Sequence, residues 1–95
     1  MNLLGGEIIE DFKAKNADSR TGLDKFQQSV AQCKAKNMVE LKNTFPSVDY
    51  VKPNFVFDIS HNSYRLLAAV SFKIQTIIVM KVGTHAEYDK WDLKR

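Results

Sequence analysis

Three runs in the second half of the chain decide its fold: FVFDI at residues 55–59, YRLLAAVSF at residues 64–72 and TIIVMKV at residues 76–82. In the first run, apolar residues at every second position predict a half-buried strand. The other two runs are almost wholly apolar, which is typical of central strands covered on both faces. Lys73-Ile74-Gln75 joins them, and Tyr50-Val51 fits a short edge strand. Together they predict an antiparallel sheet of three to four strands.

Helical periodicity precedes these strands. Two apolar stripes at helical spacing consist of Leu4, Ile8, Ile9 and Phe12, and of Leu23, Phe26, Val30 and Cys33. Because only residues 16–19 separate the stripes, we expect an antiparallel helical hairpin. A third, short helix is expected to begin at Asn37, with Glu40 completing its cap, and to end before Pro46.

A second capping pattern, Thr84-His85-Ala86-Glu87, predicts a short C-terminal helix through about Trp91. The expected fold is therefore α+β, with N-terminal helices packed on the sheet. The 95 residues provide for one modest core, so we expect a single domain over residues 1–95. Cys33 is the only cysteine, which excludes an internal disulfide and a cysteine metal cluster; it fits a small buried residue better than a nucleophile.

The charge distribution is mildly basic. The net charge is +3 and the pI is near 9.1, which is compatible with nucleic acid binding but does not establish it. The excess of positive charge lies between Pro46 and Ala86. This segment contains two acidic residues, Asp49 and Asp58, and four basic residues, Lys52, Arg65, Lys73 and Lys81. No basic leader and no bilayer-length apolar run is present, so we expect a cytoplasmic protein without a membrane partner.

Strand pairing predicts a cluster of polar residues. If Phe72 lies opposite Thr76, Arg65 lies opposite Gly83, and Lys81 becomes its diagonal neighbour on one face, roughly 7–8 Å away. His85 and Tyr88 follow on one turn of helix. The sequence thus predicts that four chemically active side chains converge.

This cluster suits cleavage of RNA by its own 2′-hydroxyl, which needs a proton acceptor, a proton donor and positive charge at the phosphate. Histidine can accept or donate a proton near neutral pH, which assigns this role to His85. Arg65 and Lys81 can neutralise the phosphate, and Tyr88 can stack on a base or donate to an oxygen. This chemistry requires no metal and no cofactor. The other candidate RNA-binding residues are His61, Lys52 and Lys73.

Ordinary structural roles fit the same residues. With a tight turn at 60–63, Asp58 lies opposite Arg65, which then becomes a cross-strand ion-pair partner. Lys81 and His85 also fit solvent-exposed positions, Tyr88 and Trp91 fit packing residues, and His61 fits a turn. A glycine phosphate loop, an H-E-x-x-H metal motif and a G-x-S-x-G elbow are all absent. Spacing alone leaves both interpretations open.

The C-terminal half resembles a known family. Val56-Phe57-Asp58-Ile59, Asn62-Ser63-Tyr64-Arg65-Leu66 and the stretch V-G-T-H-A-E-Y-D-K at residues 82–90 resemble the HigB family of toxin–antitoxin mRNA interferases, as does Leu41-Lys42 followed by Phe45-Pro46-Ser47. The resemblance covers roughly residues 38–92. It implies a RelE/ParE-like fold, ribosome-dependent cleavage of mRNA, growth arrest, and neutralisation by a HigA-like antitoxin whose complex with the toxin binds operator DNA. It also implies that Arg65 binds phosphate and that His85 and Tyr88 belong to the catalytic motif.

The sequence departs from the family pattern at several cationic positions. Relatives often carry lysines at Ser60 and Ser63, and arginines at Ala69 and Lys81. Fewer cations weaken the grip on phosphates. Two alternatives therefore stay open: a RelE/ParE-fold toxin that acts on another target such as gyrase, and an attenuated toxin that only binds its antitoxin.

Overall fold

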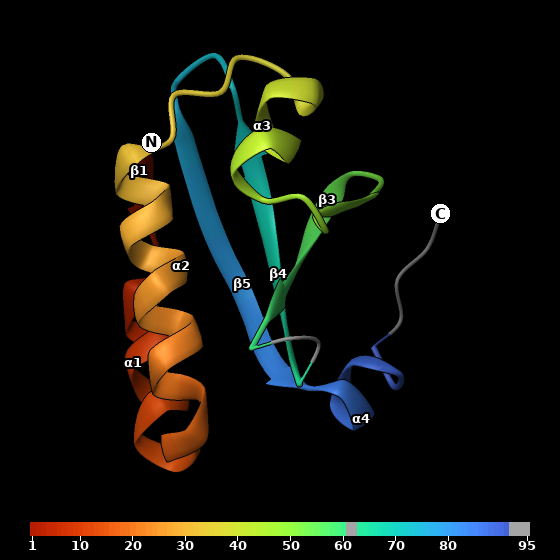
Figure 1. Cartoon of the computed structure of the whole chain (residues 1–95). Coiled ribbons are helices and arrows are strands. Elements are labelled where there is room, and N and C mark those ends of the chain that lie inside the picture. Colours follow the sequence, from red (N-terminus) through yellow and green to blue (C-terminus); the bar gives the residue numbers. More distant parts are fainter. Residues whose placement is uncertain (61–62, 92–95) are drawn as a thin grey trace.

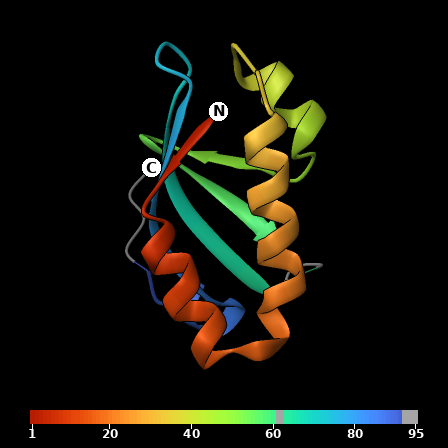
Figure 2. The same cartoon turned by 90° about the vertical axis from the view of Figure 1, so that its left-hand side faces the viewer.

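A computed structural model describes residues 1–60 and 63–91 and shows helices covering one face of a mixed sheet (Figure 1). The elements are β1 (Asn2–Leu4), α1 (Gly6–Lys15), a 3-10 turn (Ala17–Ser19), α2 (Arg20–Gln32), α3 (Met38–Thr44), β2 (Asp49–Val51), β3 (Asn54–Ile59), β4 (Tyr64–Ser71), β5 (Thr76–Thr84) and α4 (His85–Tyr88). Figure 2 shows α1 and α2 running in opposite directions, which confirms the helical hairpin. The α+β class is also confirmed.

The sheet has five strands in the order β1-β5-β4-β3-β2. The expectation of three to four antiparallel strands was wrong in one respect, because β1 adds a fifth strand that pairs in parallel with β5. Three residues are too few to show strand alternation, and Leu4 fits the helical stripe that follows. Leu4 instead pairs with Ile78 and is 55% exposed.

Gly5 separates β1 from α1. Its φ of 83° lies in the left-handed region, which glycine adopts without steric cost. A Cβ at this position would lie 2.6 Å from the carbonyl oxygen of Val79. The chain therefore turns here, and the first helix begins at Gly6 rather than at Leu4.

The main core lies between the helices and the sheet. The predicted stripe of Leu23, Phe26, Val30 and Cys33 is fully buried, and Cys33 is a free thiol within it. The rings of Phe26, Phe45 and Phe57 pack within 5.0–5.5 Å of one another, so α2, the end of α3 and β3 share one aromatic cluster.

A smaller cluster lies on the other face of the sheet, where Val51, Val56 and Leu67 pack under Tyr88 and Trp91. Burial of both faces is thereby confirmed for the centre of β4. The prediction that both faces are buried was wrong for β5, because Ile78 and Met80 are 40% and 45% exposed on the face opposite the helices. The C-terminal segment covers the Arg65 end of this face.

A bulge divides the β4–β5 pairing. Arg65 pairs with Gly83 and Leu67 with Lys81, as the sequence predicts, but Ala68 pairs with Val79. The pairing shift skips Met80, so Ser71 rather than Phe72 lies opposite Thr76. The predicted register is therefore correct at the Arg65 end and wrong by one residue at the turn.

Both predicted helix caps form, with differences in detail. The Asn37 side chain accepts from the Glu40 amide, but Glu40 accepts from the Lys36 amide rather than that of Asn37. The Thr84–Glu87 capping box is complete. However, α4 ends at Tyr88 and is shorter than predicted.

A buried lysine joins the two helices of the hairpin. Lys13 of α1 contacts Asp24 and Gln27 of α2 as well as Glu10, and its side chain is only 7% exposed. Burial disfavours the charge, but the hydrogen bonds to Asp24 and Glu10 outweigh it, so the pKa of Lys13 is raised. The hydrogen bond from Lys13, with a second from Gln27, lowers the pKa of Glu10.

Among the described residues, no helix has the length and apolar character needed to cross a bilayer.

Candidate functional site

Arg65 lies near the start of β4, on the face opposite the α1–α2 hairpin. Its Nε atom lies 3.0 Å from Oδ1 of Asp58, its cross-strand partner on β3. Its guanidinium carbon lies 5.3 Å from the centroid of the Tyr88 ring. The side chain is 12% exposed, so a carboxylate and an aromatic ring hold the guanidinium in place. The predicted ion pair forms, and Tyr88 adds a contact that does not follow from strand pairing.

Arg65 lines a pocket of about 400 Å³. The pocket lies between the α3–β2 segment and α4, and its lining residues are Lys42, Pro46, Ser47, Val48, Asp49, Val56, Asp58, Arg65 and Tyr88. Two cations and two carboxylates thus face the same volume. Such a mixture suits a ligand that carries both a phosphate and hydrogen-bond donors, as a nucleotide does.

Lys42 is a pocket residue that the analysis of strand spacing missed. It is an exposed residue near the end of α3, more than twenty positions before Arg65 in the sequence. Tertiary packing of α3 beside the sheet brings it to the pocket. The only sequence signal was its position in the Leu41-Lys42 and Phe45-Pro46-Ser47 run.

The remaining predicted catalytic residues lie on or beside α4. The rings of His85 and Tyr88 are 6.4 Å apart in an edge arrangement, and Tyr88 in turn lies against Arg65. The His85 side chain is 55% exposed, and its Nδ1 atom lies 3.5 Å from Oδ2 of Asp89. Its backbone amide donates to the carbonyl of Ser63, so the start of α4 is tied to the β3–β4 turn. His85, Tyr88 and Arg65 therefore form a continuous group.

Lys81 lies on the same face as Arg65 but contacts a different partner. It pairs with Leu67, as predicted, and its Nζ atom lies 5.7 Å from the centroid of the Trp91 ring. The ring of Trp91 also packs against Tyr88, with the centroids 5.6 Å apart. Lys81 thus extends the positive side of the site along β5, beside the pocket rather than within its lining.

The structure does not bring the other predicted RNA-binding residues to this pocket. Lys52 lies in the β2–β3 turn and Lys73 in the β4–β5 turn, both at the other end of the sheet. At about 3.3 Å per residue, Lys73 lies about 25 Å along the strand from Arg65. Their RNA-binding role stays a prediction, and His61 lies outside the described residues.

The positions that depart from the family pattern lie outside the lining of the Arg65 pocket. Ala69 shares the face of Arg65 and pairs with Ile78, so an apolar surface replaces a cation there. Ser60 adopts a φ of 53° and packs close to Gly22 of α2, where a Cβ would lie 2.1 Å from its Oγ. Ser63 is exposed in the turn.

Among the described residues, no group of three His, Cys, Asp or Glu side chains could hold a metal ion.

The sequence that forms this fold and pocket matches a class of bacterial toxins. A family model for the HigB toxin, described as a RelE-like toxic component of a toxin–antitoxin system, matches residues 19–91. The chain therefore belongs to the HigB toxin family.

Similar curated proteins extend the match over nearly the whole chain. The mRNA interferase toxin HigB of Escherichia coli strain K12 is 32% identical over 92 residues, which cover 94% of this chain and 88% of that protein. The mRNA interferase HigB of Shigella flexneri has the same identity and coverage. The mRNA interferase HigB of Escherichia coli O6:H1 strain CFT073 is 24% identical over 93 residues, which cover 95% of this chain and 90% of that protein.

Proposed function

We propose that this chain is the toxin of a toxin–antitoxin pair and that it acts as an endoribonuclease on mRNA. The observation that carries the proposal is the Arg65 guanidinium, held by Asp58 and Tyr88 on the wall of a nucleotide-sized pocket. The proposal is further supported by relatives named mRNA interferases, which the chain matches over 88–90% of their length.

The groups present can perform cleavage through the 2′-hydroxyl of the RNA. Arg65 holds the scissile phosphate and stabilises the charge that develops on it, since a guanidinium carries five N–H donors and can contact two anions at once. Lys42 and Lys81 add positive charge from either side. The attacking 2′-oxygen gives up its proton and the departing 5′-oxygen receives one, and His85 can serve one of these transfers.

Two further features complete the arrangement. Asp89 lies within reach of Nδ1 of His85, so it can orient the ring. The Tyr88 ring covers Arg65 and offers a hydroxyl and an aromatic edge to the substrate. All the groups that this scheme needs are protein side chains, and the scheme therefore proceeds without a metal ion.

We further propose that cleavage depends on the ribosome. The pocket carries two carboxylates beside its two cations, so it attracts free RNA weakly. The His85 imidazole is largely exposed, and docking against ribosomal RNA would bury it and fix the mRNA in line with Arg65. A cognate antitoxin of the HigA type, which also carries the complex to operator DNA, is the expected protein partner.

The same balance of charge favours a second candidate, an attenuated toxin that retains only antitoxin binding. Serines and an alanine stand where relatives often have cations, and the pocket has no net charge in its lining. This candidate predicts antitoxin binding without cleavage or growth arrest. Action on gyrase predicts growth arrest with intact mRNA.

The test uses purified toxin with a defined mRNA, either free or bound to ribosomes, with magnesium present throughout because ribosomes dissociate without it. We expect cuts only in ribosome-bound mRNA, with a 2′,3′-cyclic phosphate on one fragment and a 5′-hydroxyl on the other. Equal cutting of free mRNA would refute ribosome dependence, and fragments that carry a 3′-hydroxyl and a 5′-phosphate would refute cleavage through the 2′-hydroxyl. No cutting of either substrate favours the attenuated toxin.

A further inference from the structure

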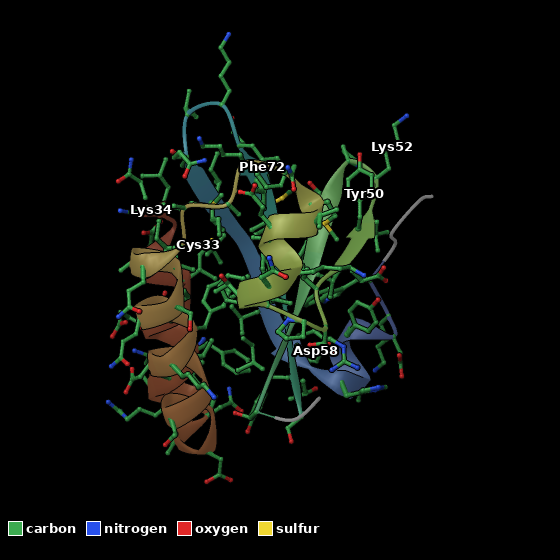
Figure 3. The ribbon with its side chains drawn as sticks, turned by 45° about the horizontal axis from the view of Figure 1, so that its top comes forward. Cys33, Lys34, Tyr50, Lys52, Asp58 and Phe72 are labelled. Carbon is green, nitrogen blue, oxygen red and sulfur yellow. The ribbon has the colours of Figure 1, made fainter. Side chains whose placement is uncertain are left out.

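A second pocket lies at the end of the sheet farthest from Arg65. It has a volume of about 330 Å³, and its lining residues are Met38, Tyr50, Pro53, Phe55, Val70 and Phe72. Figure 3, turned so that this end comes forward, shows Tyr50 and Phe72 there, with Asp58 away from them. The hydroxyl of Tyr50 is the only side-chain hydrogen-bonding group of this lining. The pocket therefore suits an apolar side chain.

Exposed apolar residues belong to the lining of this pocket or lie close to it in sequence. Val39 is 76% exposed beside Met38, Ile74 is 62% exposed in the β4–β5 turn, and Tyr50 itself is 50% exposed. These residues come from α3, β2 and the β4–β5 turn, so several separate segments present apolar surface at one end of the molecule. Exposed apolar side chains gathered at one end of a molecule are a feature of interaction sites.

Lysines lie close in sequence to the pocket lining. Lys36 precedes Met38 by two residues, Lys52 adjoins Pro53, and Lys73 adjoins Phe72; all three are exposed. None of them makes an ion pair with another described side chain within 4.0 Å. Two acids lie near these lysines in sequence: Glu40 accepts a hydrogen bond from the Lys36 amide, and Asp49, three residues before Lys52, lines the Arg65 pocket instead. The rim is thus positively charged around an apolar centre.

Hydrogen bonds fix this end of the molecule. The Gln75 side chain donates to the carbonyl of Ala35 and to that of Phe72, both at 2.8 Å, and so ties the β4–β5 turn to the α2–α3 segment. The Phe55 ring packs between those of Tyr50 and Phe72, with its centroid 4.9 Å from that of Tyr50 and 6.1 Å from that of Phe72. The surface is therefore already formed before any partner binds.

The lining favours a protein ligand over RNA. Base recognition uses hydrogen bonds to base edges or open aromatic faces for stacking. Here the lining offers a single hydroxyl, and the aromatic rings pack against one another. An apolar side chain flanked by carboxylates meets both the pocket and its lysine rim.

We propose that this apolar pocket and its rim of Lys36, Lys52 and Lys73 form the docking surface for an acidic segment of the antitoxin, with an apolar side chain as anchor. Family membership supplies the partner, because the HigB toxin is one component of a toxin–antitoxin pair. The surface supplies the chemistry of the segment. This proposal assigns Lys52 and Lys73 to the protein partner rather than to RNA.

The test measures the affinity of the full-length toxin for its separately purified cognate antitoxin by calorimetry, at low and high salt. For Lys36→Gln/Lys52→Gln/Lys73→Gln we expect about tenfold weaker binding and a smaller salt dependence. A matched control, Lys15→Gln/Arg20→Gln/Lys25→Gln, removes the same charge from α1 and α2 and is expected to bind within about twofold of wild type. Tyr50→Glu places an acid at the pocket and is expected to weaken binding further, whereas Tyr50→Phe retains it.

Two results would overturn the proposal: unchanged antitoxin affinity in the folded triple-lysine variant, and equal weakening in the matched control. If the variant with unchanged antitoxin affinity also binds a single-stranded RNA oligonucleotide more weakly than wild type, these lysines bind RNA instead. If Tyr50→Glu does not fold, the lysine variants decide the question. The measurement reports binding alone, so its result is independent of whether the chain cleaves mRNA.

Discussion

The guanidinium carbon of Arg65 lies 5.3 Å from the centroid of the Tyr88 ring, which joins the last residues of the fold to its central strand. Asp58 holds the same guanidinium from the neighbouring strand. An arginine fixed on two sides keeps its planar fork in one orientation, and this lowers the entropy lost when it binds a phosphate. The account of function rests on this arrangement.

Arg65→Lys retains the charge but removes the planar fork. We expect cleavage of ribosome-bound mRNA to fall by roughly 100-fold, because a lysine cannot contact Asp58 and a phosphate with the same geometry. Initial cleavage rates check this, and circular dichroism establishes that the variant is folded. A fully active Arg65→Lys protein would show that only charge is needed at this position.

Tyr88 can be divided into its ring and its hydroxyl. Tyr88→Phe keeps the ring over Arg65, so we expect it to retain activity within about tenfold if the ring's role is to position the guanidinium. Tyr88→Ala removes that contact and part of the small Val51, Val56 and Leu67 cluster, and is expected to lose much more. If Tyr88→Phe is as inactive as Tyr88→Ala while its Tm is unchanged, the hydroxyl itself takes part in the chemistry.

His85 carries the proton-transfer assignment. Its side chain is 55% exposed, so His85→Ala is expected to leave the Tm nearly unchanged. Cleavage is expected to fall by about 10²–10⁴-fold, the usual contribution of a general acid or base. Initial rates on ribosome-bound mRNA measure this loss. A folded His85→Ala protein with the wild-type rate would exclude His85.

A substitution at Gly5 tests whether β1 pairs with β5 as the structure shows. Gly5→Ala puts a Cβ 2.6 Å from the Val79 carbonyl oxygen at a φ of 83°. We expect a loss of about 1–3 kcal/mol in the free energy of unfolding. Urea denaturation measures this loss, and Gly6→Ala, where no atom lies within 4 Å of the added Cβ, is the matched control. Equal stabilities of the two variants would mean that β1 does not pack against β5.

The Lys13 cluster predicts how stability depends on pH. The lowered pKa of Glu10 means that its contribution is present above its ordinary value of 4.5 and is lost as the pH falls through the lowered value. The raised pKa of Lys13 means that its contribution is present below its ordinary value of 10.5 and is lost as the pH rises through the raised value. We therefore expect a stability plateau between these limits, with Lys13→Met flattening the alkaline side. An unchanged alkaline limb in Lys13→Met, measured by urea denaturation, would show that this lysine does not contribute.

Local patterns were enough to predict most of the fold. Each of these patterns arises because residues close together in sequence are buried on the same face. The positions of β3, β4, β5 and α2 could therefore be predicted from the alternation in β3, the apolar runs of β4 and β5, and the apolar stripe of α2. The pairing of Arg65 with Asp58 followed from a short turn and strand geometry, whereas its pairing with Gly83 was correct because the β5 bulge offsets the one-residue error at the turn. The parallel β1 could not be predicted, because its partner β5 lies more than seventy residues away and three residues carry no periodicity.

The site was predictable in part for the same reason. Arg65, His85 and Tyr88 belong to consecutive or paired elements, and the structure brings them together. Lys42 approaches through the packing of α3, which no local pattern encodes. The bulge at Met80 shifts the β4–β5 pairing by one residue. The predicted pairing was therefore correct at Arg65 but wrong by one residue at the turn near Lys73.

Mapping of mRNA 5′ ends in cells, shortly after induction of wild type or of Arg65→Gln/His85→Ala, tests the central claim most directly. The account predicts discrete new ends inside translated reading frames with the wild-type toxin and none with the folded double variant. New ends that persist in the double variant would contradict the assignment of the site. Growth arrest by the wild type without any new ends would contradict cleavage of mRNA itself.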